Sequence, residues 1–167
     1  YKKRETSWRR RIFACRKGDG DQVNEREERI SLRADRAKRI FLGGANCAES
    51  IWQAFSEGLD QDEQALGNCL ASGFGGGLGS GDLCGAIAGG IMVLGLHYGR
   101  IPGKPRNEML KELCQKFYEQ AKEELGSVYC RDLRDPEDEN YREKCAEIVA
   151  KMAALIEKIL EEGKENS

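Results

Sequence analysis

Long apolar runs are missing from this sequence. No stretch of 18 uncharged apolar residues occurs among its 167 residues, and the most apolar uncharged stretch, 83–99, is interrupted by glycines and a histidine. This pattern argues against a membrane-spanning helix. The alternation of apolar and polar residues that is typical of strands is also missing. The sequence therefore predicts an all-α protein without a membrane span, built as a compact bundle of about five or six helices.

The sequence also has little histidine and no large excess of either charge. His97 is the only histidine, and it lies near the end of an apolar stretch, where a packed side chain is favoured over a ligand or proton carrier. No Ser/His/Asp hydrolase can be argued from it. The 27 Lys and Arg against 29 Asp and Glu give a net charge of −2, and 40% of the residues are hydrophobic. These values fit a single domain with a core of ordinary size.

The first 24 residues form a basic tail by composition. Eight of the first 20 are Lys or Arg, but no fold of their own is predicted for them, so nucleic acid is not an expected partner. The triplet Arg9-Arg10-Arg11 is not followed by the apolar segment of an export signal, which predicts a cytoplasmic protein. We expect the domain to span 25–163, followed by a short tail over 164–167.

Helical spacing of apolar residues recurs along the whole domain. Asn46 and Asp60 are suitable N-caps, and Glu49, three residues after Asn46, completes a capping box. Asp135-Pro136 is typical of a helix start, and Gly163 is expected to close that last helix. The predicted helices cover residues 25–42, 47–55, 61–72, 83–99, 107–125 and 135–163.

Glycine is abundant in one place. Six of the ten residues in 73–82 are glycine, which predicts a glycine-rich loop whose backbone N–H groups can hold an anion. Gly81, Gly85 and Gly89 recur every four residues, so one face of the next helix lacks side chains, and another backbone or a cofactor can approach it closely. The candidate cofactor-binding glycines are Gly75, Gly76, Gly77, Gly85 and Gly89.

The seven cysteines are an odd number, and in a reducing compartment this favours metal binding, redox chemistry or burial over a disulfide framework. Cys47 and Cys84 are placed at helix N-termini, where unpaired N–H groups and the helix dipole lower a thiol pKa or stabilise a metal thiolate. Cys130 and Cys145 could face the same site, although Cys145 also continues an apolar stripe.

The other cysteines have no such context. Cys69 and Cys114 lie in apolar helical stripes, which predicts burial, and Cys15 lies in the basic tail.

The order of these features resembles a known family. Asn46-Cys47-Ala48-Glu49-Ser50, the Gly-Phe-Gly-Gly-Gly run at 73–77, and Cys84-Gly-Ala-Ile-Ala-Gly89, followed by Cys130 and Cys145, resemble the C_GCAxxG_C_C family of redox-active proteins over about 35–159. The resemblance implies a redox role shared by four cysteines, Cys47, Cys84, Cys130 and Cys145. The region is also similar to a domain of split-Soret cytochromes, in which an iron–sulfur cluster accompanies haem. Because this chain has no Cys-x-x-Cys-His motif, we expect no covalent haem.

Two redox functions follow from these residues. The first is an iron–sulfur cluster, 2Fe-2S or 4Fe-4S, with Cys47, Cys84, Cys130 and Cys145 as metal ligands, used for electron transfer or redox sensing. The second is metal-free thiol–disulfide chemistry, an oxidoreductase-type activity in which Cys84 attacks a disulfide or oxidant and another of the four, such as Cys47, resolves the product. Of the two, the cluster is narrowly favoured.

Two further functions rank lower. Structural zinc usually draws on closely spaced cysteine pairs, which this chain lacks. A non-catalytic module could instead grip an anion with its glycine loop, or form a homodimer through its glycine face, with the cysteines incidental. For either redox function, the expected partner is a redox protein or a small-molecule oxidant or reductant.

Overall fold

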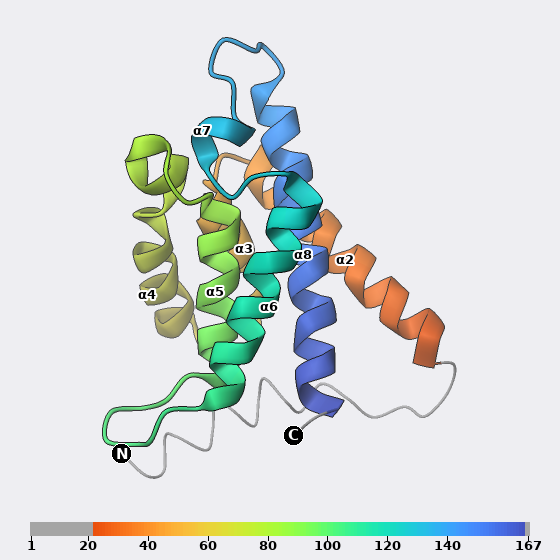
Figure 1. Ribbon diagram of the computed structural model, residues 1–167, viewed down its shortest axis with the longest axis vertical. Coiled ribbons are helices and arrows are strands. Elements are labelled where there is room, and N and C mark those ends of the chain that lie inside the picture. The colour runs from red at the N-terminus through yellow and green to blue at the C-terminus, as the bar shows by residue number, and fades with distance from the viewer. Residues whose placement is uncertain (1–21, 166–167) are drawn as a thin grey trace.

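The computed structural model of the protein describes residues 22–165 (Figure 1). The predicted basic tail falls mostly outside this range, as do Cys15 and residues 166–167. Residues 22–24, however, belong to the first described helix and not to a tail.

The described part of the chain is helical and contains no strand, which confirms the all-α class. It has seven α-helices, one more than the upper number expected, because the connection after residue 126 contains a helix of four residues. None of these helices is long and apolar enough to cross a membrane. The elements are α2 (Gln22–Leu42), α3 (Cys47–Phe55), α4 (Gln61–Ser72), the turn η1 (Gly77–Gly81), α5 (Gly85–Tyr98), α6 (Glu108–Leu125), α7 (Cys130–Leu133) and α8 (Tyr141–Glu165).

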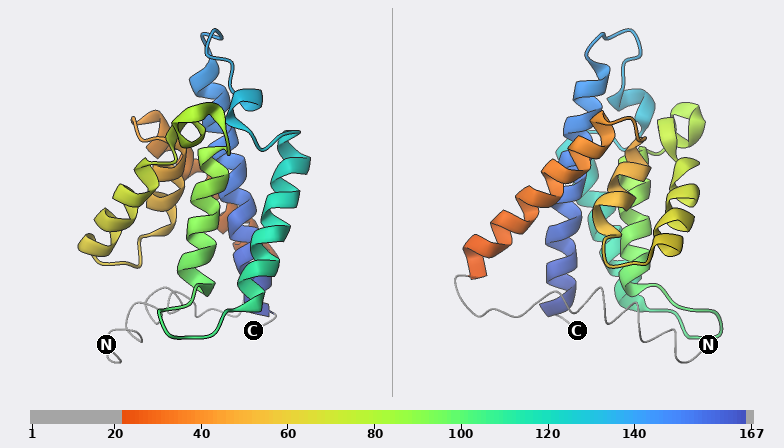
Figure 2. Two further views of the ribbon diagram at one scale, coloured as in Figure 1. Left: turned by 60° about the vertical axis from the view of Figure 1, so that its left-hand side comes forward. Right: turned by 180° about the vertical axis from the view of Figure 1, so that it is seen from behind.

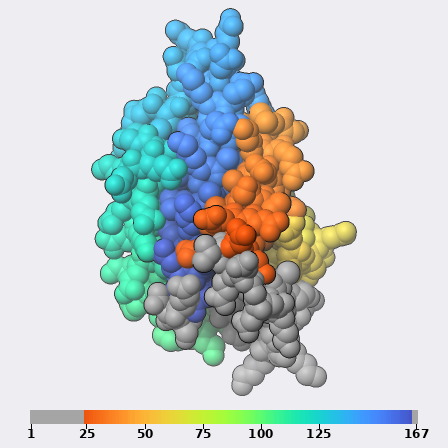
Figure 3. Space-filling model, turned by 90° about the vertical axis from the view of Figure 1, so that its right-hand side faces the viewer, coloured from red at the N-terminus to blue at the C-terminus, as the bar shows by residue number. Residues whose placement is uncertain are grey.

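The long helix α8 runs through the middle of the bundle. It packs against α2, α5, α6 and α3, while α3 packs in turn on α5 and α4. Figures 1 and 2 show η1, α7 and the start of α8 at one end of the molecule. In Figure 3, α8 is seen between α6 and α2. The core between these helices is formed by large, fully buried side chains, among them Phe117, Ile51, Ile87, Leu94, Met152 and Ile156.

The predicted helix starts at 47 and 61 are confirmed. The Asn46 side chain accepts hydrogen bonds from the N–H groups of Ala48 and Glu49, and the Glu49 carboxylate accepts from the Asn46 N–H. Asp60 and Glu63 form the same reciprocal pair at the start of α4. Both signals are local, since cap and partner are three residues apart, and this is why the sequence reveals them.

The glycine-rich segment is not the irregular loop that the sequence predicts. Its last part, η1, is a tight turn in which the Asp82 N–H donates to the Gly77 carbonyl at 2.9 Å. Gly76, Gly77, Leu78 and Gly79 all have positive φ, a backbone conformation that costs other residues roughly 1–2 kcal/mol each. The glycines are therefore needed for the left-handed course of the turn, and Leu78 adopts it at φ 59°.

The glycine face of α5 lies against α3. A Cβ atom on Gly89 would lie 3.0 Å from the Ala48 Cα and carbonyl oxygen, and one on Gly85 would lie 3.2 Å from the Cys47 Cβ. The predicted close approach is thus made by a neighbouring helix backbone. It places the start of α3, with Cys47, directly against the start of α5.

The last helix starts later and ends later than predicted. Residues 135–140 form turns, in which the side chains of Asp135 and Asp138 accept hydrogen bonds from the N–H groups two residues on. These local bonds compete with a helix, so α8 begins at Tyr141. Gly163 does not end the helix. A Cβ at this position would lie 2.4 Å from the Tyr98 hydroxyl oxygen, so the glycine leaves room for a side chain of α5.

Candidate functional site: four clustered cysteines

The fold brings the four family cysteines to one end of the bundle. Cys47 is the first residue of α3, Cys84 is the N-cap of α5, Cys130 begins α7, and Cys145 lies in the second turn of α8. The charges of Cys84, Cys130 and Cys145 all act on Cys47, and those of Cys130 and Cys145 act on Cys84. The starts of α3, α5, α7 and α8, which are distant in sequence, lie toward the same end of the bundle (Figure 1).

Cys84 and Cys130 are held together by a short antiparallel bridge between Leu83 and Tyr129. The Cys84 N–H donates to the Val128 carbonyl at 2.8 Å, and the Cys130 N–H donates to the Asp82 carbonyl at 2.7 Å. Because side chains alternate along extended segments, both cysteines point away from the side of Leu83 and Tyr129. The bridge thus directs two thiols to a common face.

The turn η1 packs tightly under this pair. A Cβ on Gly77 would lie 2.5 Å from the Cβ of Cys130 and 2.6 Å from the Asp82 carbonyl oxygen. Any larger residue at 77 would therefore push the Cys130 segment away from Cys84. The glycines of the turn support the site by their small size.

Cys47 is fixed by the capping box of α3 and its link to α4. The Asn46 amide donates to the Ser72 carbonyl at 3.1 Å, and the Ser72 hydroxyl donates to Glu49 at 2.6 Å. A Cβ on Gly75 would lie 2.9 Å from the Asn46 amide nitrogen. The N-terminus of α3 is consequently held between the end of α4 and the glycine-rich segment.

The central interaction of the site is a hydrogen bond between the thiols of Cys47 and Cys145. It lowers the pKa of Cys145 to about 7, below its ordinary value of 9.0, and the positive charges of Arg134 and Arg142 contribute to the same effect. The pKa of Cys47 is raised by this hydrogen bond, by burial and by the neighbouring sulfurs. Cys47 therefore keeps its proton and donates it to a Cys145 thiolate.

The other two thiols favour the protonated form. Burial is the main cause that raises the pKa of Cys84, although hydrogen bonds from the N–H groups of Ala86 and Ile87 act in the opposite direction. Burial also raises the pKa of Cys130. The lowering expected for Cys47 and Cys84 from their helix N-termini is thus outweighed by burial and by neighbouring sulfurs, and the activated thiol is Cys145.

Three further residues of the site, Arg134, Tyr141 and Arg142, are not predicted from the sequence. Arg134 lies with its guanidinium 4.5 Å from the centre of the Tyr141 ring. Arg142 lies over Phe41 and donates to its carbonyl at 2.9 Å. Only the spacing of Tyr141 and Cys145, four residues apart on one helix face, could have hinted at a shared location.

The remaining predicted residues lie elsewhere or have other roles. Cys69 is exposed on α4, which makes the prediction of burial wrong, and Cys114 is only partly buried on α6. Cys69 follows an apolar spacing, but that face of α4 points to solvent. Gly85 and Gly89 contact α3, and His97 is buried near the end of α5.

The four sulfurs are close, but they do not form a ready-made metal site. Among residues 22–165, no group of three or more His, Cys, Asp or Glu side chains is arranged to hold a metal ion. A metal or cluster on these cysteines would require the sulfurs to move toward a common centre.

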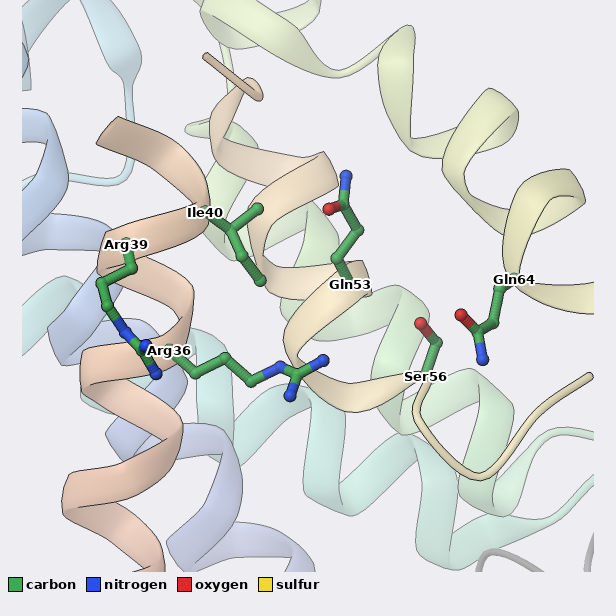
Figure 4. Close-up of a pocket in the computed structure, with 6 residues that line it drawn as sticks. All are labelled: Arg36, Arg39, Ile40, Gln53, Ser56 and Gln64. Carbon is green, nitrogen blue, oxygen red and sulfur yellow. The ribbon is translucent and has the colours of Figure 1, made fainter. Parts of the chain in front are cut away.

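A pocket of about 420 Å³ lies away from the cysteines, between α2, α3 and α4. Figure 4 shows the Arg36 side chain extending toward Ser56. The Arg36 guanidinium forms an ion pair with Glu57. Its lining residues are Arg36, Arg39, Ile40, Gln53, Ser56 and Gln64.

The fold and site together define a helical protein with four cysteines gathered at one end of the bundle. The chain belongs to the family described as "Putative redox-active protein (C_GCAxxG_C_C)", which matches residues 45–159. It is also similar to an uncharacterized protein of Archaeoglobus fulgidus, with 31% identity over 147 residues that cover 78% of this chain and 97% of the relative. No solved structure matches it.

Proposed function

We propose that this redox protein acts by thiol–disulfide exchange, with Cys145 as the nucleophile and Cys47 as the resolving thiol. The proposal is supported by the placement of Cys145 beside Cys47 and near the positive charges of Arg134 and Arg142, all of which lower the pKa of Cys145. The thiolate is the attacking form in such exchange, and a pKa close to the ambient pH gives the fastest attack.

The reaction proceeds in two exchanges. The Cys145 thiolate attacks one sulfur of a disulfide R–S–S–R, so a Cys145–S–S–R bond forms and one RS⁻ leaves. Cys47 then loses its proton to that thiolate and attacks the Cys145 sulfur, which releases the second RS⁻ and leaves a Cys47–Cys145 disulfide. The substrate gains two electrons and the protein loses two. A dithiol reductant returns the protein to its starting state by the reverse exchange.

The test uses the full chain, reduced and kept under anaerobic conditions. A small disulfide is added, and the product is mapped by peptide mass spectrometry. We expect a Cys47–Cys145 disulfide, and we expect Cys145→Ser to lose the reaction while Cys114→Ser, a change at a more distant cysteine, keeps it. If Cys145→Ser reacts at the rate of the unchanged protein, Cys145 is not the nucleophile.

A second candidate is an iron–sulfur cluster held by Cys47, Cys84, Cys130 and Cys145. The convergence of four cysteines supports it, because four thiolates are the usual ligand set of such clusters. The backbone N–H groups of Ala86 and Ile87 at the start of α5 would stabilise the negative charge of that centre. When bound, a cluster supplies one-electron transfer in place of two-electron exchange.

The two candidates differ in a direct measurement. Protein purified without oxygen is examined by visible absorption, and its iron, sulfide and zinc are quantified. Colourless, metal-free protein with the expected disulfide mapping supports the exchange mechanism. Brown protein with matched iron and sulfide, whose colour disappears in Cys84→Ser but persists in Cys114→Ser, supports the cluster and overturns the exchange mechanism.

A further inference from the structure

Arg134 is held directly beside the thiol–thiolate pair. It follows α7, and its backbone N–H donates to the Cys130 carbonyl at 2.8 Å. Its guanidinium lies over the Tyr141 ring, with 4.5 Å between the guanidinium carbon and the ring centre. Tyr141 and Cys145 are four residues apart and project from the same side of α8. The cation is therefore fixed on the side of the helix that carries the thiolate.

The guanidinium of Arg134 has unused donors. Its Nε is buried and has no hydrogen-bond partner, and no carboxylate among residues 22–165 forms an ion pair with it. Arg26, Arg29, Arg33 and Arg36, by contrast, all pair with glutamates. A buried donor without a partner is costly. A ligand that accepts its hydrogen bonds would remove that cost.

The glycine-rich segment lies next to these donors. A Cβ atom on Gly76 would lie 4.0 Å from Nη1 of Arg134, so the guanidinium lies beside the backbone of the turn. Arg131, by contrast, is stacked on Tyr129, and its Cβ lies against the Gly81 side of the turn. Arg134 is thus the arginine that faces both the turn and the reactive sulfur.

The burial of the sulfur limits the size of a substrate. Only 8% of Cys145 is exposed, so a folded protein surface cannot bring a disulfide flat against it. A substrate disulfide must therefore be small. A planar carboxylate matches the fork of a guanidinium better than any other common anion of that size except phosphate.

We infer that Arg134, beside the glycine turn, forms a carboxylate-binding subsite, and that the substrate class is a small disulfide carrying carboxylates near its sulfur atoms. This inference rests on the proposed exchange function. The carboxylate binds the guanidinium, and this places the disulfide bond next to Cys145 for the two exchanges described above. Arg134 is a substrate-binding residue in this scheme.

The test compares three small disulfides of different charge. They are dithiodiglycolate, which carries two carboxylates, bis(2-hydroxyethyl) disulfide, which is neutral, and cystamine, which carries two ammonium groups. Second-order rate constants are measured at a pH well above the pKa of Cys145. Each is divided by the rate constant of a free thiol with the same disulfide. This division removes the intrinsic reactivity of the three probes.

We expect the normalised rate constant for dithiodiglycolate to exceed that for cystamine by about tenfold. The Arg134 guanidinium attracts the carboxylates of the first probe and repels the ammonium groups of the second. Arg134→Gln should remove this preference, and Arg134→Lys should restore part of it. Arg131→Gln, which changes the neighbouring stacked arginine, should keep it.

The outcomes separate the two proposals. If none of the three disulfides reacts, the exchange function fails. If all three react without a charge preference, or if Arg134→Gln keeps the preference, the exchange function stands and the carboxylate subsite is overturned.

Discussion

At the scale of single residues, the reactivity of the site depends on which of two sulfurs holds a proton. Cys47 and Cys145 share one hydrogen bond, and the difference between them arises from their surroundings. Two arginines act on Cys145, whereas none is among the groups that act on Cys47. Opposite charges stabilise a thiolate and like charges destabilise it. The assignment of nucleophile and resolving thiol follows from this asymmetry.

The hydrogen bond can be tested by its effect on pH dependence. Because only the thiolate reacts, the alkylation rate of Cys145 by iodoacetamide should rise with pH through a midpoint of about 7. Cys47→Ala removes the donor and should move this midpoint upward, toward the ordinary pKa of a cysteine. Cys47→Ser keeps a hydroxyl donor and should leave it low. Peptide mapping isolates the signal of Cys145 from that of the exposed Cys69.

An unchanged midpoint in Cys47→Ala would contradict this account. It would mean that Arg134 and Arg142 alone stabilise the thiolate, and Arg134→Gln would then become the decisive variant.

At the scale of secondary-structure elements, the site depends on the close packing of α3 on α5. Gly89 touches the Ala48 backbone, whereas Gly95, on the same helix, has no atom within 4 Å of where a Cβ would be. Gly89→Ala should lower the free energy of unfolding by about 1–3 kcal/mol, because the added methyl forces the helices apart. Gly95→Ala should raise it by up to about 1 kcal/mol, because alanine favours a helix. Urea denaturation measures both.

Opposite signs for these two substitutions are the essential result. Equal destabilisation by both would show that α5 is sensitive to any added methyl group and that the contact with α3 has no special role.

Local signals in the sequence predict the elements well, and long-range contacts explain most of what they miss. The caps at Asn46 and Asp60 are encoded within four residues and are predicted correctly. The true start of α8 depends on turns made by Asp135 and Asp138, which compete with the helix start that Pro136 suggests. Gly163 serves a contact with Tyr98, which is distant in sequence. A pattern along one segment contains no information about such a partner.

The same reasoning applies to the site. Its four cysteines can be named from the sequence because their spacing matches a family, but the thiolate cannot be assigned to one of them. That assignment needs the pairing of Cys47 with Cys145 and the position of Arg134, and each of these is a contact between separate elements. Helix N-termini are visible in the sequence, whereas the burial that outweighs them is not.

At the scale of the whole molecule, buried ion pairs attach α2 to α8. Glu161 is 6% exposed and binds Arg26 and Arg29 at 2.8 and 2.6 Å. Glu161→Ala should reduce the free energy of unfolding by about 1–2 kcal/mol, a modest value because both arginines are partly exposed. Glu147→Ala removes an exposed partner of Lys38 between the same two helices, and it should cost less than about 0.5 kcal/mol.

Thermal unfolding of the two variants compares these contributions directly. If Glu147→Ala destabilises the protein as much as Glu161→Ala, burial does not distinguish the two ion pairs.

The pairing of Cys47 with Cys145 has a consequence for the mechanics of the chain. These residues are about 100 positions apart, so a bond between their sulfurs would close most of the domain into a covalent ring. Restricting the unfolded chain in this way stabilises a fold by about 4–5 kcal/mol in the loop-entropy description. We therefore expect a higher melting temperature for the oxidised protein than for the reduced one, and no difference in Cys47→Ala. The melting temperature would then indicate whether the protein is in its oxidised or its reduced state.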